Sequence, residues 1–145
     1  MKVTVGSAGK VASTVSLDGH DLLFDQPATV PHGEGRGPSP LDVMLASVAG
    51  CAHYFASAYL MARGIATDAV RVEAEAEKSR QPVSRWSRVN IRVLLPPEVP
   101  QEMLPGIERA VRGCPAYGTL IHPPEVQLTF EREERPRDEA LRHAS

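Results

Sequence analysis

Apolar and polar residues alternate along two parts of the chain. In the first 25 residues, valines and leucines are separated by polar neighbours, and the pair Asp18-Gly19 is typical of a turn. Residues 70–77 and 86–95 alternate more strictly, so that every second side chain is apolar. Because the side chains of a strand point in turn to its two faces, these segments predict short antiparallel strands with one face in water.

A longer, almost uninterrupted apolar stretch at residues 43–62 predicts a helix in the middle of the chain. Ser39 can cap its N-terminus, and Pro40 suits the first helical position, where a missing N–H costs nothing. Gly64 stands where a helix would stop. The predicted helix therefore runs over residues 40–63.

The helical spacing of apolar residues returns in the last third of the chain. Residues 98–113 predict a second helix, which Pro105 is expected to kink, split or delay. An alternating segment at residues 126–132 predicts a last strand, and a highly charged tail follows it. The order of strands, long helix, strands, second helix and strand favours an α+β fold over a regularly alternating α/β sheet.

The length of 145 residues predicts a single domain. A loop with four prolines and three glycines precedes the long helix. The domain divides into N-terminal strands and loop (1–38), a central helix (39–64), strands and a second helix (65–133) and a tail (134–145).

Charge and composition exclude several classes of partner. Sixteen Lys and Arg residues against eighteen Asp and Glu residues give a net charge of −2, without the basic excess that nucleic-acid binding requires. The N-terminus lacks the apolar stretch of a secretion signal, so we expect a cytoplasmic protein. Residues 43–62 are long enough to span a membrane, but they are rich in alanine, serine and glycine. We expect this segment to be the buried helix of a soluble fold, with no membrane partner.

The two cysteines are the first candidates for chemistry. Cys51 lies in the middle of the predicted long helix and shares a face with apolar residues, including Val48 and Phe55. Cys114 precedes Pro115 at the predicted end of the second helix. In the cytoplasm such a pair is reduced and is either redox-active, catalytic or inert packing, and its 63-residue spacing does not decide among these.

Other candidate sites are weaker. The histidines and cysteines have no spacing typical of a metal site, so we expect no metal. The glycine-rich segment at residues 33–37 lacks the ending of a phosphate-binding loop, and its glycines are expected to serve a tight turn. Arg36, within it, could stabilise a cysteine thiolate or could simply be exposed to solvent.

Three motifs resemble one known family. Gly-Pro-Ser-Pro opens the long Ala-rich helix (37–40), Ala-Gly-Cys stands within it (49–51) and Cys-Pro closes a later helix (114–115). In this order and spacing they resemble the OsmC/Ohr family of thiol peroxidases, the osmotically induced and organic hydroperoxide resistance proteins. The resemblance implies an α+β intertwined homodimer, with antiparallel sheets wrapped around long central helices and active sites at the subunit interface.

The same resemblance implies an antioxidant enzyme that acts in oxidative stress without a cofactor. Cys51 would be oxidised to a sulfenic acid by an organic (alkyl or lipid) hydroperoxide, and Cys114 would resolve it to a disulfide. A dithiol reductant, which is a lipoylated protein for some members, would regenerate the thiols. Arg36 matches the Arg-Gly-Pro sequence of one branch and is the third expected site residue. Leu41 stands where many members with well-defined peroxidase sites have Glu.

Two alternatives stay open on the sequence alone. A dimer of the same fold could bind apolar ligands or act as a slow oxidant sensor without turnover, which the replacement of Glu by Leu41 favours. Both cysteines could also be inert core residues of an interaction scaffold, whose thiols would then not react with small alkylating reagents.

Overall fold

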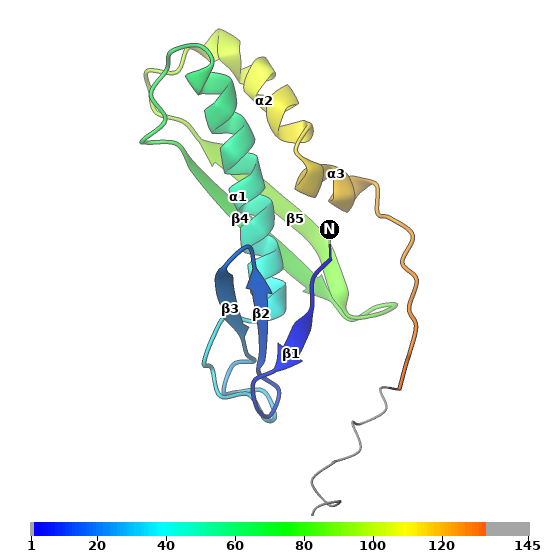
Figure 1. The fold of residues 1–145 in the computed structure, drawn as a ribbon. Coiled ribbons are helices and arrows are strands. Elements are labelled where there is room, and N and C mark those ends of the chain that lie inside the picture. Colours follow the sequence, from blue (N-terminus) through cyan, green and yellow to red (C-terminus); the bar gives the residue numbers. More distant parts are fainter. Residues whose placement is uncertain (1, 133–145) are drawn as a thin grey trace, which may run out of the picture.

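A small antiparallel sheet forms the N-terminal part of the protein, whose computed structural model describes residues 2–132 (Figure 1). Its strands pair in sequence order: β1 (Val5–Ser7), β2 (Ser13–Leu17) and β3 (His20–Phe24). Asp18 and Gly19, between β2 and β3, have positive φ angles of 48° and 81°. Two such residues in succession make a tight hairpin turn, so the predicted strands and turn are confirmed.

A loop joins β3 to the long helix α1 (Pro40–Met61). Ser39 caps α1 as predicted, because its Oγ accepts the backbone N–H of Asp42 at 3.2 Å, and Pro40 is the first helical residue. The helix ends slightly before the predicted residue 63. Gly64, with a φ of 72°, then turns the chain.

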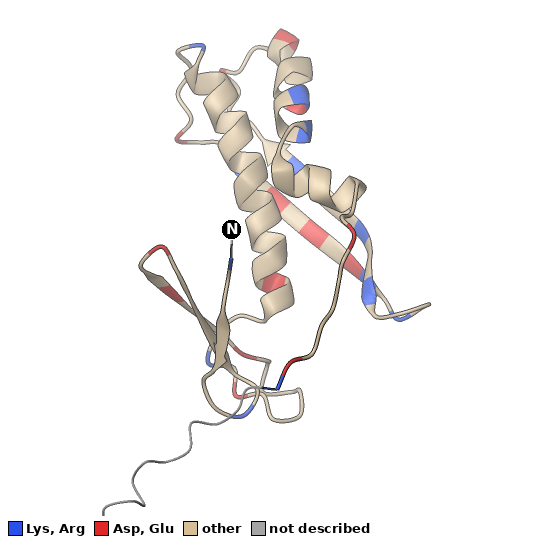
Figure 2. Cartoon of the chain, turned by 45° about the vertical axis from the view of Figure 1, so that its right-hand side comes forward, with Lys and Arg blue, Asp and Glu red and all other residues tan. Residues whose placement is uncertain are grey.

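A two-stranded antiparallel hairpin of β4 (Arg71–Ser79) and β5 (Arg85–Leu94) lies under α1, as Figure 1 shows. The predicted alternation is confirmed. Apolar residues of one face pack against the core, among them Val72, Ile91 and Val93. The opposite face is charged (Figure 2), with ion pairs Glu73–Arg92 at 3.2 Å and Glu77–Arg88 at 3.5 Å. Such exposed pairs add little stability, so this is the solvent face.

Two helices follow the hairpin where the sequence predicted one. After a 3₁₀ turn (Gln101–Met103), α2 covers Leu104–Arg112 and α3 covers Pro115–Ile121. Pro105 delays α2, because a proline fits only in the first turn. The helix α3 was not predicted, since Pro115 was interpreted as an end and is instead the first residue of a new helix.

The core lies between α1, the hairpin and α2. Gly106 of α2 passes so close to Tyr59 of α1 that a Cβ at residue 106 would overlap the tyrosine hydroxyl. The missing side chain at Gly106 is what leaves room for Tyr59 between the two helices. The buried core residues are Ala52, Ala56, Leu60, Val70, Ile107 and Val111.

One side of α1 is not packed against any other element of the described part of the chain. Only 28% of its most apolar 18-residue window is buried, whereas a fully buried helix was expected. By length and composition α1 could cross a membrane, but core helices of soluble proteins pass the same test. The exposed side is rich in apolar and small residues: Met44, Ser47, Gly50, Tyr54, Ala58 and Met61.

The predicted strand at residues 126–132 is wrong for the single chain. These residues have no strand pairing, and Val126, Leu128 and Phe130 are 83%, 77% and 90% exposed. In Figure 1 the segment runs away from both sheets, and none of the strands described within residues 2–132 pairs with it. The predicted tail at residues 134–145 lies outside the described residues.

Candidate functional site

The structure brings the two cysteines together. Cys51 lies in the middle of α1 and is half-buried, whereas Cys114, the residue that caps α3, is only 1% exposed. The helices α1 and α3 pack on each other. The Cys51 thiol is near enough to raise the pKa of Cys114. Two reduced thiols, one accessible and one enclosed, are therefore neighbours.

The surroundings of Cys114 keep it protonated. Burial is the main cause that raises the pKa of the Cys114 thiol above its ordinary value, and the neighbouring Cys51 raises it further. The backbone N–H groups of Ala116 and Tyr117 act in the opposite direction but do not outweigh burial. Because the thiolate is the nucleophile, Cys114 is a poor first reactant, and the more accessible Cys51 meets reagents from solvent first.

We expect the two thiols to be alkylated at different rates. In single-cysteine proteins, Cys51 (in Cys114→Ser) should react with iodoacetamide faster at neutral pH than Cys114 (in Cys51→Ser), because Cys114 is enclosed and burial raises the pKa of its thiol, which lowers its thiolate fraction. The alkylation rate of Cys114 should keep rising as the pH passes 9.0, the ordinary pKa of a thiol, because burial raises the pKa of Cys114 above that value. Mass spectrometry measures both rates. Equal rates at neutral pH would contradict the difference in environment.

Arg36, the third predicted site residue, is not brought to the thiols within one chain. Its Nη1 donates a hydrogen bond to the carbonyl of Ala8, in the β1–β2 turn, at 2.9 Å. Cys51 lies about three turns, or about 16 Å, along α1 from Pro40. In Figure 2 the N-terminal sheet stands apart from α1. The guanidinium is exposed and keeps further donors free.

An apolar cavity of about 430 Å³ lies close in sequence to Cys114, although neither cysteine lines it. It lies between β5, α2 and α3 and is walled by valine, isoleucine and leucine side chains. Arg112 stands at its edge, where its Nε donates to Glu108 at 2.8 Å and its Nη1 to the Tyr117 hydroxyl at 3.0 Å. The backbone N–H of Tyr117 also acts to lower the pKa of Cys114. The cavity can hold an apolar organic group with a polar end at Arg112 and Tyr117.

The sequence reasoning did not single out Arg112 or Tyr117. A signal existed, since Glu108 and Arg112 have the i, i+4 spacing of a helical ion pair and Arg112 lies two residues before Cys114. Tyr117 had none, because its role depends on the unpredicted α3.

Within residues 2–132 the structure has no group of three His, Cys, Asp or Glu side chains that could hold a metal ion.

Comparison with known proteins places this arrangement among solved folds. A family model described as OsmC-like protein matches residues 33–129. An osmotic stress induced and detoxification response protein of Psychrobacter arcticus is 21% identical, with a TM-score of 0.72 over 85% of this chain and 89% of that one. An OsmC-like protein of Mycoplasma pneumoniae is 20% identical, with a TM-score of 0.70 over 83% and 86% of the two chains.

A more distant structure bears on chemistry by its name. The organic hydroperoxide resistance protein OsmC of Legionella pneumophila is 16% identical, with a TM-score of 0.57 over 83% of this chain and 89% of that one. A comparison with curated proteins finds no match. The similar structures therefore confirm the α+β fold with antiparallel sheets.

Proposed function

This chain belongs to the OsmC-like family, and on that premise we propose that it is a thiol peroxidase that reduces organic hydroperoxides. The family supports a general redox or peroxidase-type role. The observation that supports the specific reaction is the pairing of an accessible Cys51 with a buried, protonated Cys114. A peroxidatic thiol must be reached by the peroxide from solvent, whereas a resolving thiol must reach only the oxidised cysteine beside it.

The reaction follows from these two environments. The Cys51 thiolate attacks the terminal oxygen of the hydroperoxide, the O–O bond breaks, and an alcohol leaves with one proton while Cys51 becomes a sulfenic acid. The Cys114 sulfur then attacks the Cys51 sulfur, the S–O bond breaks, and the Cys114 proton leaves with the hydroxyl as water. A dithiol reductant supplies two electrons and two protons to restore both thiols.

The apolar cavity supports an organic substrate over hydrogen peroxide. Its walls, which include neither cysteine, would hold the alkyl part of the substrate, with Arg112 and Tyr117 at the polar end of the cavity. The disulfide product requires a reductant, for which a lipoylated protein is a candidate. We place the reaction in the cytoplasm, where thiols are kept reduced.

A homodimer would complete the site. Two copies could pack α1 against α1 through the uncovered apolar side defined above. The exposed alternating residues Val126, Leu128 and Phe130 could then pair with a strand edge of the partner. Arg36, which lies far from Cys51 in its own chain, would reach the thiols of the other subunit. There its charge would stabilise the thiolate and orient the hydroperoxide.

The test is a thiol titration of the folded wild type before and after one equivalent of cumene hydroperoxide, with hydrogen peroxide for comparison. We expect two thiols to fall to none, faster with the organic peroxide. Survival of both thiols, or loss only as slow as that of free cysteine, would overturn the peroxidase. That outcome would favour the non-catalytic binder or slow sensor, which Leu41 supports, and the cavity would then be screened for apolar ligands.

A further inference from the structure

A buried carboxylate organises the loop in front of α1. Asp25 directly follows β3 and is only 2% exposed. It accepts three backbone N–H groups, from Gln26 at 2.7 Å, Glu34 at 3.3 Å and Arg36 at 3.1 Å. The Arg36 N–H is the largest cause that holds the pKa of Asp25 below its usual value. The charged form of Asp25 is therefore the one that binds the loop.

The glycines of this loop make these hydrogen bonds possible. A Cβ on Gly33 would overlap the carbonyl of Pro27, and a Cβ on Gly37 would overlap that of Leu23. Gly35 has a φ of 67°, which side chains disfavour. Glycine at every second position therefore lets the residues between, Glu34 and Arg36, turn their N–H groups to Asp25.

We infer that Asp25 is a positioning residue for Arg36, an inference that rests on the proposed function. Two contacts hold Arg36: its backbone N–H is bound to Asp25, and its guanidinium is bound to the Ala8 carbonyl. Asp25 also donates its own backbone N–H to the Pro38 carbonyl, at the far end of the loop, at 3.2 Å. The loop can therefore shift as a unit only if its hydrogen bonds to Asp25 break. Asp25 thus fixes the position of the Arg36 backbone and, through it, of the Arg36 guanidinium.

The test variant is Asp25→Asn, which keeps the shape and removes the charge. An amide offers one acceptor oxygen, so its NH₂ would face either the N–H of Gln26 or the N–H groups of Glu34 and Arg36, and in both cases the oxygen that binds the loop loses its charge. We expect the second-order rate constant with cumene hydroperoxide to fall about tenfold to a hundredfold, since a displacement of about 1 Å in an orienting group costs in that range. Arg36→Gln should lose as much, and the double variant no more than either.

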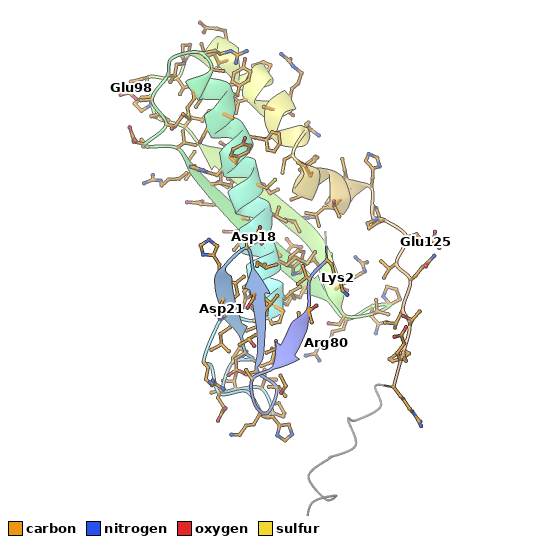
Figure 3. All side chains as sticks on the ribbon, viewed as in Figure 1. Lys2, Asp18, Asp21, Arg80, Glu98 and Glu125 are labelled. Carbon is orange, nitrogen blue, oxygen red and sulfur yellow. The ribbon has the colours of Figure 1, made fainter. Side chains whose placement is uncertain are left out.

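A matched control and a second readout separate position from folding. Asp21→Asn changes an exposed aspartate of β3, labelled in Figure 3, whose carboxylate accepts a hydrogen bond from the Ser16 hydroxyl and not from the loop, and should leave the rate unchanged. Hydrogen exchange at the Glu34 and Arg36 amides should be slow in the wild type and fast in Asp25→Asn. If Asp25→Asn does not fold, Gly35→Ala strains the same loop without changing the carboxylate and should give the same two effects.

Three results would overturn the inference. Additive losses from Asp25→Asn and Arg36→Gln would mean that Asp25 acts independently of Arg36. Unchanged exchange in Asp25→Asn would mean that the carboxylate does not hold the loop. If the wild type does not react with hydroperoxide, the proposed function fails, and with it any catalytic role of the hydrogen bonds that join the loop to Asp25. Slow exchange of the Glu34 and Arg36 amides would still show that these hydrogen bonds exist.

Discussion

Replacing Cys51 by serine should lower hydroperoxide reduction by about a thousandfold or more, because it removes the only accessible thiol that can attack the substrate. Replacing Cys114 by serine should leave the first step intact and stop the reaction at the Cys51 sulfenic acid. The difference follows from burial, since Cys114 is enclosed and protonated and can act only on its neighbour.

Mass spectrometry after one equivalent of cumene hydroperoxide distinguishes the two variants. Cys114→Ser should gain one oxygen and react with dimedone, a sulfenic acid reagent, whereas Cys51→Ser should remain unmodified. The wild type should lose two hydrogens as it forms the disulfide. Retained turnover in Cys51→Ser, or a sulfenic acid on Cys114, would contradict the assigned roles.

A charge on the uncovered side of α1 should separate the proposed dimer. Tyr54 lies on that side and is 65% exposed, so Tyr54→Glu should not disturb the fold of the single chain. Between two packed helices the unpaired carboxylate would cost about 2–5 kcal/mol of dimer affinity. That cost corresponds to about a thirtyfold to a several-thousandfold rise in the dissociation constant.

Sedimentation equilibrium measures this effect. The wild type should have twice the 15.7 kDa mass of one chain, and Tyr54→Glu should dissociate toward that mass at micromolar concentration. Val83→Glu is the matched control, because Val83 is 62% exposed in the β4–β5 loop and should leave the dimer intact. A wild type that stays at the mass of one chain at every concentration would exclude the dimer, and the position of Arg36 would then lack its proposed explanation.

Local sequence signals predicted most of the elements. Ser39 and Pro40 marked the start of α1 because capping depends on residues within one turn. The Asp18-Gly19 turn and the alternation in β4 and β5 were equally local. Pro115 was misinterpreted because proline suits both the residue after a helix and the first residue of the next one.

The sequence named candidate site residues without their geometry, and their roles stay predictions. Cys51, Cys114 and Arg36 were named from motifs, yet their distances depend on how α1, α3 and the N-terminal sheet pack. The structure unites the two cysteines and leaves Arg36 bound to the Ala8 carbonyl. Asp25 was not singled out, because a lone aspartate after a strand has no pattern until the loop folds over it.

The sequence by itself therefore determined most of the helix and strand positions and the α+β class, since these depend mainly on contacts between near neighbours in the chain, and it singled out the two cysteines as candidates. Only the tertiary structure decided which thiol is enclosed, what lies beside it and which surfaces remain uncovered. Burial and proximity arise from packing between segments far apart in sequence, and residues 126–132 illustrate the limit. Their alternation indicates a strand, but a strand needs an edge to pair with, and the single chain provides none there.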